Sequence, residues 1–311
     1  MRILIAGATG AIGRALVPLL VAAGHEVTGT SRTLERASEL TRLGATPAAM
    51  DALDRAATAT IVARTKPDVL VHQLTALPRV PDLRKPGIYE ATDRLRREGT
   101  ANLIAAALDA GVERMVAQSI AFAYRPDGNA VKGEDAPLAI DAPAPFGQTV
   151  RAVASLEEQV TATRGLDGTV LRYGWLYGEG TYFARDGFIA GEVLKRRYPL
   201  IGSAKGIYSF VHTSDAAAAT VAAIERTATG TVNVVDDEPM ALREWLPIYA
   251  KALGAKPPLR IPRIMARLAA GPVVAQMATE MRGASNAKAQ SDLEWQPQFP
   301  SVRDGFAELA A

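Results

Sequence analysis

The feature that most constrains the fold is a glycine-rich segment that begins at residue 7. A short apolar run from Ile3 to Ile5 precedes the sequence GATGAIG, with glycine at positions 7, 10 and 13, and a helix-like stretch follows. Between a strand and a helix, such glycines allow a tight turn, close approach of the backbone to a pyrophosphate, and close helix packing. The helix N-terminus adds positive potential for phosphates. The segment therefore predicts dinucleotide binding, with a purely structural turn as the alternative.

Strand and helix patterns alternate through the first half of the chain. The expected strands are 3–6, 26–29, 46–50, 68–72, 114–118 and 169–172, and the expected helices between them are 11–23, 34–43, 54–64, 90–110 and 144–163. This alternation indicates right-handed β-α-β crossovers and a parallel sheet. The predicted fold class is α/β, a Rossmann-type doubly wound parallel sheet with its ligand at the carboxyl ends of the strands.

The pattern loosens after about residue 176. We expect residues 1–175 to form the dinucleotide-binding Rossmann domain and residues 176–311 a smaller C-terminal α/β substrate-binding region, with strand exchange from later in the chain as an open alternative. Expected helices lie at 188–197, 214–226 and 242–253, and expected strands at 209–211 and 231–234. Residues 264–281 are apolar at helical spacing, which favours a core-facing helix over a lid or a membrane-surface helix.

Charge and residue usage exclude several function classes. The net charge is +2, from 35 basic and 33 acidic residues, which gives no basic excess for nucleic acid. The cluster Arg94, Arg96 and Arg97 is interpreted as a solvated helix face. The absence of cysteine excludes disulfides and thiolate chemistry, and three distant histidines favour no metal site. No uncharged run is long enough for a membrane span, so we expect a cytoplasmic protein.

Several landmarks, in this order along the chain, resemble the extended short-chain dehydrogenase/reductase superfamily, and within it the NAD(P)-dependent epimerase/dehydratase group. The landmarks are the glycine segment, Asp51, PDVLVH at 67–72, LRYG at 171–174 with Tyr177, FVH at 210–212 with Asp215, NVVD at 233–236 and LEWQP at 293–297. The resemblance implies a bound dinucleotide. The implied cofactor residues are Gly7, Thr9, Gly10, Ala11, Ile12, Gly13, Ser31, Arg32, Asp51, Ala52, Gln73, Leu74, Thr75, Ser119 and Arg172.

The end of the second strand bears on the choice of cofactor. NAD enzymes place a carboxylate there for the ribose 2′-hydroxyl, whereas NADP enzymes place an arginine nearby. Here the strand ends in Gly29-Thr30-Ser31-Arg32, with no acid. Arg32 can pair with a 2′-phosphate and Ser31 can donate a hydrogen bond, which favours NADP over NAD. The alternative is that Arg32 is a solvated residue at a helix start.

Two further assignments rest on the resemblance. Asp51 is expected near the adenine amino group, with a helix cap as its alternative. The segment of Gln73, Leu74 and Thr75 is expected beneath the nicotinamide ribose.

The resemblance also implies a serine and a Tyr-x-x-x-Lys pair for proton transfer, and here the sequence departs from it. Phe146 stands at the tyrosine position, Val150 at the lysine position, and Ile120 at the serine position, four residues before Tyr124. Phenylalanine has no proton to give. The candidate replacements that we carry forward are Tyr124, Ser119 and Tyr177.

The sequence therefore predicts an NADP(H)-dependent oxidoreductase or epimerase-like enzyme with a non-standard acid–base set. Its expected partner is a small polar molecule, of which a sugar is one candidate. The alternatives are a catalytically inactive dinucleotide-binding sensor or regulatory protein, and an isomerase or lyase that uses the cofactor without net redox change. The two long helices, residues 90–110 and 144–163, could also form a homodimer interface.

Overall fold

A seven-stranded sheet forms the centre of the computed structural model, which describes residues 1–310. Every neighbouring pair in it is parallel, and the strand order is β12-β7-β5-β4-β1-β2-β3. The strands are β1 (Arg2–Ala6), β2 (Glu26–Ser31), β3 (Thr46–Ala49), β4 (Val69–His72), β5 (Arg114–Ile120), β7 (Asp167–Tyr173) and β12 (Gly230–Val234). The predicted doubly wound parallel sheet is confirmed. The strand order reverses between β1 and β4, where such sheets bind their ligands.

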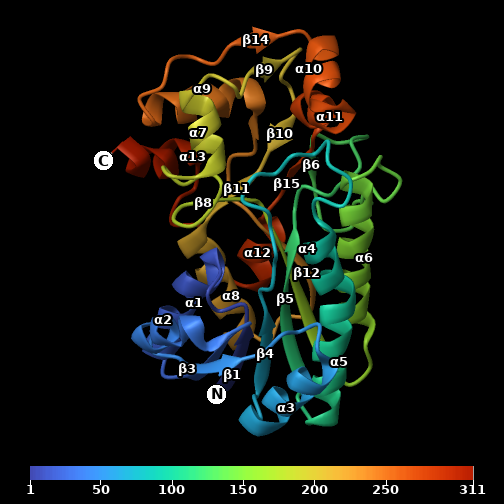
Figure 1. Cartoon of the computed structure of the whole chain (residues 1–311), viewed down its shortest axis with the longest axis vertical. Helices are drawn as coiled ribbons and strands as arrows, with labels where there is room; N and C mark the ends of the chain where they lie inside the picture. The colour runs from blue at the N-terminus through green and yellow to red at the C-terminus, as the bar shows by residue number, and fades with distance from the viewer. Residues whose placement is uncertain (311) are drawn as a thin grey trace.

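Alternation along the strands places apolar side chains on both faces of the sheet, because successive residues of a strand point to opposite sides. Ile3 and Ile5 contribute to one core and Leu4 to the other. Helices cover both faces (Figure 1). The first core is covered by α1 (Ala11–Ala22) and α8 (Thr213–Glu225), with α2 (Ala37–Arg42) near the sheet edge; the second is covered by α3 (Arg55–Thr65), α5 (Thr100–Asp109) and α6 (Phe146–Ala162).

The helix predicted over residues 90–110 contains an irregularity. It consists of α4 (Glu90–Arg94), a π-helical turn η2 (Leu95–Gly99) and α5. A π turn holds one more residue than an α turn and is frequent at functional sites. Of the two arginines in this turn, Arg96 is buried and Arg97 is not.

The smaller unit lies above the sheet in Figure 1, at the carboxyl ends of its strands. Its core is aromatic, with Tyr177, Phe210, Trp245 and Phe306 almost fully buried. Short two-stranded pairs and helices surround that core: β6 (Val131–Lys132), β8 (Trp175–Tyr177), α7 (Phe188–Leu194), β9 (Leu200–Ile201), β10 (Ile207–Tyr208), β11 (Phe210–His212), β13 (Met240–Ala241), α9 (Leu242–Ala252), β14 (Arg260–Ile261), β15 (Gly283–Ala284) and α13 (Val302–Gly305). The helix α12 (Ala287–Asp292) instead packs beside β12, with Ala289 in the first core of the large sheet.

The expectation of one core-facing helix over residues 264–281 is wrong. The segment forms two helices, α10 (Arg263–Ala270) and α11 (Pro272–Glu280), separated by Gly271, whose φ of 94° ends the first helix. Of α10 only Ala266 is buried, whereas α11 buries Val273, Ala275 and Ala278. Proline has no amide hydrogen and favours the first position of a helix, so Pro272 starts a new helix.

Two elements from late in the chain return to the large sheet. β12 pairs with β7 along its edge, with Val234 opposite Tyr173, and α8 packs against α1. A later strand therefore completes the first sheet, as the strand-exchange alternative anticipated. Of the helices in residues 1–310, none combines the length and the apolar character required to cross a membrane.

Candidate functional site

The glycine turn, residues 7–13, joins β1 to α1 at the reversal of strand order. Gly7 has a φ of 94°, and a Cβ there would lie 2.6 Å from the carbonyl oxygen of Gln73, just beyond β4. A Cβ on Gly13 would lie 2.6 Å from the carbonyl of Ala8. Gly10 is the N-cap of α1 and has no capping side chain, and the first turn of the helix contains no acid. The free amides of this helix start are therefore open to an anion.

Two arginines and two glutamates follow β2, namely Arg32, Glu35, Arg36 and Glu39, and Arg14 of α1 reaches this segment. The Nε of Arg14 and the Nη2 of Arg36 bind Glu39 at 2.6 and 2.8 Å. Arg32 is exposed and forms no ion pair with any of residues 1–310. The Ser31 hydroxyl donates to the Thr33 carbonyl oxygen. One positive charge remains after Glu35 and Glu39 are counted against the three arginines, and Arg32 is unpaired within the described residues, so the group suits an anion such as a ribose 2′-phosphate.

The residues after β3 and β4 complete this edge. Asp51 is exposed, and its Oδ1 accepts the amide of Leu53 at 3.0 Å, while the carbonyl of buried Ala52 accepts from Asn102. Gln73 is buried and its Oε1 has no hydrogen-bond partner, whereas Thr75 is exposed. Leu74 is half-buried and donates its amide to the Nδ1 of His72.

These features fit a dinucleotide. A glycine-rich turn leads into the uncapped helix start, a basic group lies beyond β2, and an exposed carboxylate lies beyond β3. The glycine turn, Thr9, Ala11 and Ile12 would hold the pyrophosphate; Ser31 and Arg32 would hold the adenosine ribose; Asp51 would lie near the adenine; and Gln73 to Thr75 would lie below the nicotinamide ribose.

The positions of the missing proton-transfer residues meet in space, and they form an apolar cluster. Ile120 at the end of β5 and Val150 on α6 belong to one buried cluster with Ala123 and Val153, and Phe146 packs against it. Ile120 is 8% and Val150 0% exposed. The three side chains that replace the triad therefore form hydrophobic contacts where the relatives' proton-transfer groups are expected, and none of them can exchange a proton.

Beside this cluster lies a buried polar network that includes three of the predicted site residues. The Nε and Nη2 of Arg172 bind Glu157 on α6 at 2.8 and 2.6 Å, and its Nη1 donates to the Tyr124 hydroxyl and to the Glu134 carbonyl. The Ser119 hydroxyl donates to Glu157 at 2.6 Å. The Tyr124 hydroxyl donates to the Oδ1 of Asn233 on β12 at 2.7 Å.

This network limits the roles that its members can take. Burial raises the pKa of the Tyr124 hydroxyl, although Arg172 counteracts it. Burial alone would lower the pKa of Arg172, but its hydrogen bonds to Glu157 outweigh that effect and raise it. The guanidinium of Arg172 thus has three partners within the protein, and its expected contact with a cofactor stays a prediction. Ser119 and Tyr124 likewise use their protons inside the network.

Tyr177 lies apart from this network, in the aromatic core of the smaller unit. It is 1% exposed and packs against Phe210, His212 and Phe306. A Cβ on Gly305 would lie 2.0 Å from its hydroxyl oxygen, and burial raises the pKa of that hydroxyl. These surroundings favour packing over proton donation.

A second group of buried polar side chains was not predicted from the sequence. Arg96, in the π turn, is 6% exposed and binds Asp93 at 3.2 Å, and Thr149 on α6 donates to the other oxygen of Asp93 at 3.1 Å. Burial raises the pKa of Asp93 and lowers that of Arg96. The expectation of a solvated face holds for Arg94 and Arg97, which pair with glutamates at the surface, and is wrong for Arg96.

A small cavity adjoins the apolar cluster, and we name it the inner cavity. Its volume is about 40 Å³. Phe122, stacked on Trp175 at a centroid distance of 4.1 Å, lies on one side, and helix α11 lies on the other. The lining consists of Phe122, Tyr124, Pro126, Ala139, Ala142, Phe146, Val273, Gln276, Met277 and Met281. Aromatic and thioether side chains dominate it, and methionine adapts readily to a bound shape.

Comparisons with known proteins agree with this geometry. Residues 3–235 match the model of the NAD dependent epimerase/dehydratase family. The chain is 49% identical over 307 residues to a 3-diazoavenalumate denitrifying reductase from a Streptomyces species, covering 98% of this chain and 99% of that protein.

Solved structures show the same fold at low identity. The UDP-glucose 4-epimerase of Thermotoga maritima, solved with UDP-glucose, has a TM-score of 0.78 at 20% identity, covering 100% of this chain and 97% of that one. A human epimerase family protein solved with NADPH has a TM-score of 0.77 at 22% identity, covering 100% and 99%.

Proposed function

The chain belongs to the NAD dependent epimerase/dehydratase family, and on that premise we propose that it is an NADPH-dependent reductase that removes the diazo group from an aromatic diazo acid. Family membership and the reductase relative make it an NAD(P)-dependent oxidoreductase or epimerase-type enzyme. The diazo substrate and the preference for NADPH are the parts that we infer.

The observation that carries the proposal is the apolar cluster of Ile120, Phe146 and Val150. Reduction of a carbonyl creates an oxyanion that needs a proton, and a positioned acid typically contributes 10²–10⁴-fold to such a step. When bound, a reduced nicotinamide supplies a hydride, and an arenediazonium ion that gains one hydride gives the arene and dinitrogen with no further proton. A site without the tyrosine and lysine suits that chemistry and does not suit carbonyl reduction.

The lining of the inner cavity supports an aromatic substrate. Phe122, Phe146 and two methionines offer flat and adaptable apolar surface, which favours an aromatic ring over the polar, sugar-type substrate expected from the sequence. At about 40 Å³ the cavity is smaller than a substrate ring. Binding would therefore require Met277 on α11 and Met281, just after that helix, to change rotamer. Around the ring, the same residues would exclude water.

Arg32 supports the choice of NADPH. It is exposed and unpaired within residues 1–310, beside the Arg14–Glu39–Arg36 group. We expect Arg32→Asp to weaken NADPH binding by roughly 10- to 100-fold, since a charge-assisted contact is lost and a like charge is added, and to leave NADH binding nearly unchanged. Equilibrium titration of both cofactors checks this. Equal losses for the two would contradict the assignment of Arg32 to the 2′-phosphate.

The proposed reaction is tested with 3-diazo-4-hydroxycinnamate, NADPH and the purified protein. We expect oxidation of NADPH, release of dinitrogen and formation of 4-hydroxycinnamate, in equal amounts, and deuterium from labelled NADPH on the ring carbon that held the nitrogen. Reduction of 4-hydroxycinnamaldehyde serves as the carbonyl control and should be much slower.

A second candidate is the dinucleotide-binding sensor, because the apolar cluster also suits a protein without catalysis. It predicts tight cofactor binding with no oxidation of NADPH by the diazo probe. Turnover of that probe would exclude the sensor, and formation of a product without NADPH oxidation would instead support an isomerase or lyase.

A further inference from the structure

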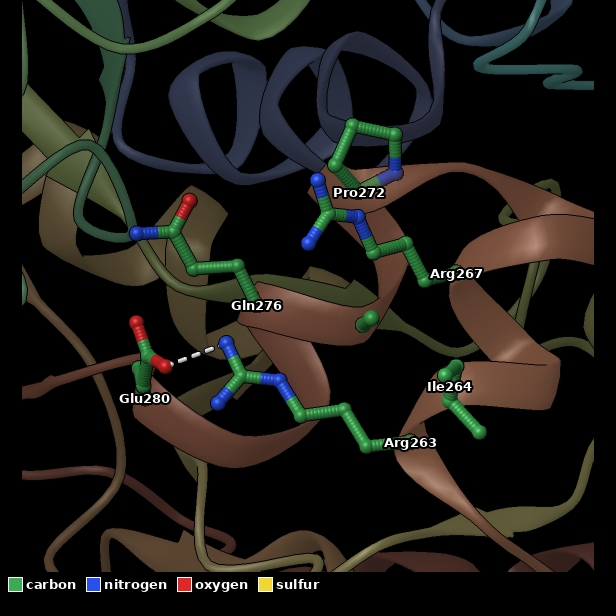
Figure 2. Close-up of a pocket in the computed structure, with 7 residues that line it drawn as sticks. Arg263, Ile264, Arg267, Pro272, Gln276 and Glu280 are labelled. Atoms are coloured by element: carbon green, nitrogen blue, oxygen red, sulfur yellow. Dashed lines mark ion pairs between the residues drawn. The ribbon is translucent and has the colours of Figure 1, made fainter.

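A second and larger cavity opens between α10 and α11, and we name it the outer cavity (Figure 2). Its volume is about 560 Å³. Two arginines of α10 and the polar side chains of Gln276 and Glu280 on α11 line it together with apolar residues. The cavity thus combines a positively charged wall with enough space for part of a small ligand.

The two arginines differ in their partners. Arg263 binds Glu280 at 2.5 Å, and Figure 2 shows its side chain turned towards that carboxylate. The guanidinium of Arg267 makes no hydrogen bond or ion pair within residues 1–310. In the same view it extends over α11 towards the side chain of Gln276. Arg267 is therefore the cation of this cavity whose charge is not already balanced.

Gln276 connects the outer cavity to the inner one. It lines both, and its neighbours Val273 and Met277 face the inner cavity, whereas Ala275 and Glu280 face the outer one. Among the described residues, Gln276 is thus the one that lines both cavities, and a ligand that occupies both must pass its side chain. A carboxylate attached directly to the ring would stay beside the ring in the inner cavity, so the part of the ligand that passes Gln276 must be a side chain of the ring.

We propose that Arg267, assisted by Gln276, binds the carboxylate of the substrate and selects aromatic acids that carry their carboxylate on an unsaturated side chain. The inference rests on the proposed function, since it names the second half of the same substrate. A guanidinium donates two parallel hydrogen bonds to a carboxylate, which makes it more selective than a lysine for this group. Arg263 is not equivalent, because Glu280 neutralises it.

Binding to the protein saturated with NADP⁺, measured by calorimetry, tests this without any turnover. The probes are 4-hydroxycinnamate, its methyl ester and 4-hydroxybenzoate. We expect the wild type to prefer 4-hydroxycinnamate to both other probes. Arg267→Gln should weaken binding of 4-hydroxycinnamate by about tenfold or more, because a charge-assisted pair is lost, and leave the ester unchanged. Arg267→Lys should recover part of the loss, and Arg263→Gln is the matched control from the same cavity, with a smaller effect.

The outcomes separate this inference from the proposed function. Arg267 does not bind the carboxylate if Arg267→Gln weakens binding of the acid and of the ester equally, or weakens neither. The same holds if the wild type binds none of the probes. Should 3-diazo-4-hydroxycinnamate still be turned over in that case, the proposed function stands alone. Acid binding that depends on Arg267, with no turnover of the diazo probe, would support the inference and overturn the proposed reaction.

Discussion

The two ends of the site are built differently. At the cofactor end the backbone determines the surface. Gly7 and Gly13 have no side chain, and a Cβ at either position would lie 2.6 Å from a carbonyl group. At the substrate end, side chains from β5, α6 and α11 determine the surface, and the positions of the family's proton-transfer residues hold an apolar cluster. The backbone end keeps the family's pattern, whereas the side-chain end departs from it. The comparison teaches that the side chains of one end can depart from the family's pattern while the backbone turn of the other end keeps it.

The largest expected effect comes from breaking the buried network that supports the side-chain end. Glu157→Gln leaves Arg172 charged and without its carboxylate, although both side chains are less than a tenth exposed. Losing one partner of a buried ion pair typically costs about 3–5 kcal/mol. Urea unfolding should show that loss. The neighbouring exposed Glu158→Gln should change the free energy of unfolding by less than about 0.5 kcal/mol, and similar values for the two variants would contradict a supporting role of Glu157.

The next effect addresses the backbone end. Gly7→Ala adds a Cβ 2.6 Å from the Gln73 carbonyl at a φ of 94°. Strain at positive φ costs roughly 1–2 kcal/mol, and overpacking adds about 1–3 kcal/mol. Gly24→Ala is the matched control, since its φ is 81° and nothing lies within 4 Å of the added atom. Thermal unfolding should therefore separate the two variants, and only Gly7→Ala should lose NADPH binding.

A pH effect arises where the two ends meet, at His72 on β4. The residue is 1% exposed, and burial together with nearby Arg96 lowers its pKa from 6.5 to about 4. Because the unfolded chain takes up the proton first, this histidine's contribution to stability is complete above pH 6.5 and is lost as the pH falls towards 4. The loss is on the order of 3 kcal/mol. His72→Asn should show a shallower decline over this range in urea unfolding, and parallel curves would contradict the assignment.

The smallest expected effect sharpens the contrast in chemistry. Phe146→Tyr restores a hydroxyl at the family's tyrosine position and keeps the ring. If the substrate needs no acid, kcat for 3-diazo-4-hydroxycinnamate should change by less than about threefold, far below the 10²–10⁴-fold of a working general acid. Phe146→Leu, which removes the ring, should mainly raise KM. A large gain in kcat for Phe146→Tyr would show that protonation limits the reaction.

Sequence reasoning succeeded where the signal is local. The glycine turn and the alternating strands depend on neighbouring residues, so the sheet and the turn between β1 and α1 could be predicted from the sequence. The break between α10 and α11 also has a local signal, the dipeptide Gly271-Pro272, which the prediction of a single helix did not take into account.

Other features depend on contacts between distant segments. Arg94, Arg96 and Arg97 look alike in the sequence, yet Arg96 is buried and binds Asp93, which also accepts a hydrogen bond from Thr149. The ion pair between Arg172 and Glu157 and the hydrogen bond from Tyr124 to Asn233 likewise join segments that no spacing rule relates. The division into units at residue 175, the homodimer and the roles of individual cofactor residues stay predictions.

The late return of β12 to the sheet has a consequence for the protein during its synthesis. By the time Tyr173 is made, six of the seven strands exist, but the last edge strand and the helix that covers α1 come only with residues 213–234. Until then Leu16 and Leu20 on α1 lack part of their cover, and Tyr124 lacks Asn233. Chains growing at ribosomal speed would spend seconds in this unfinished state. We expect a nascent chain halted between these points to recruit chaperones, and one released after residue 234 to need them less.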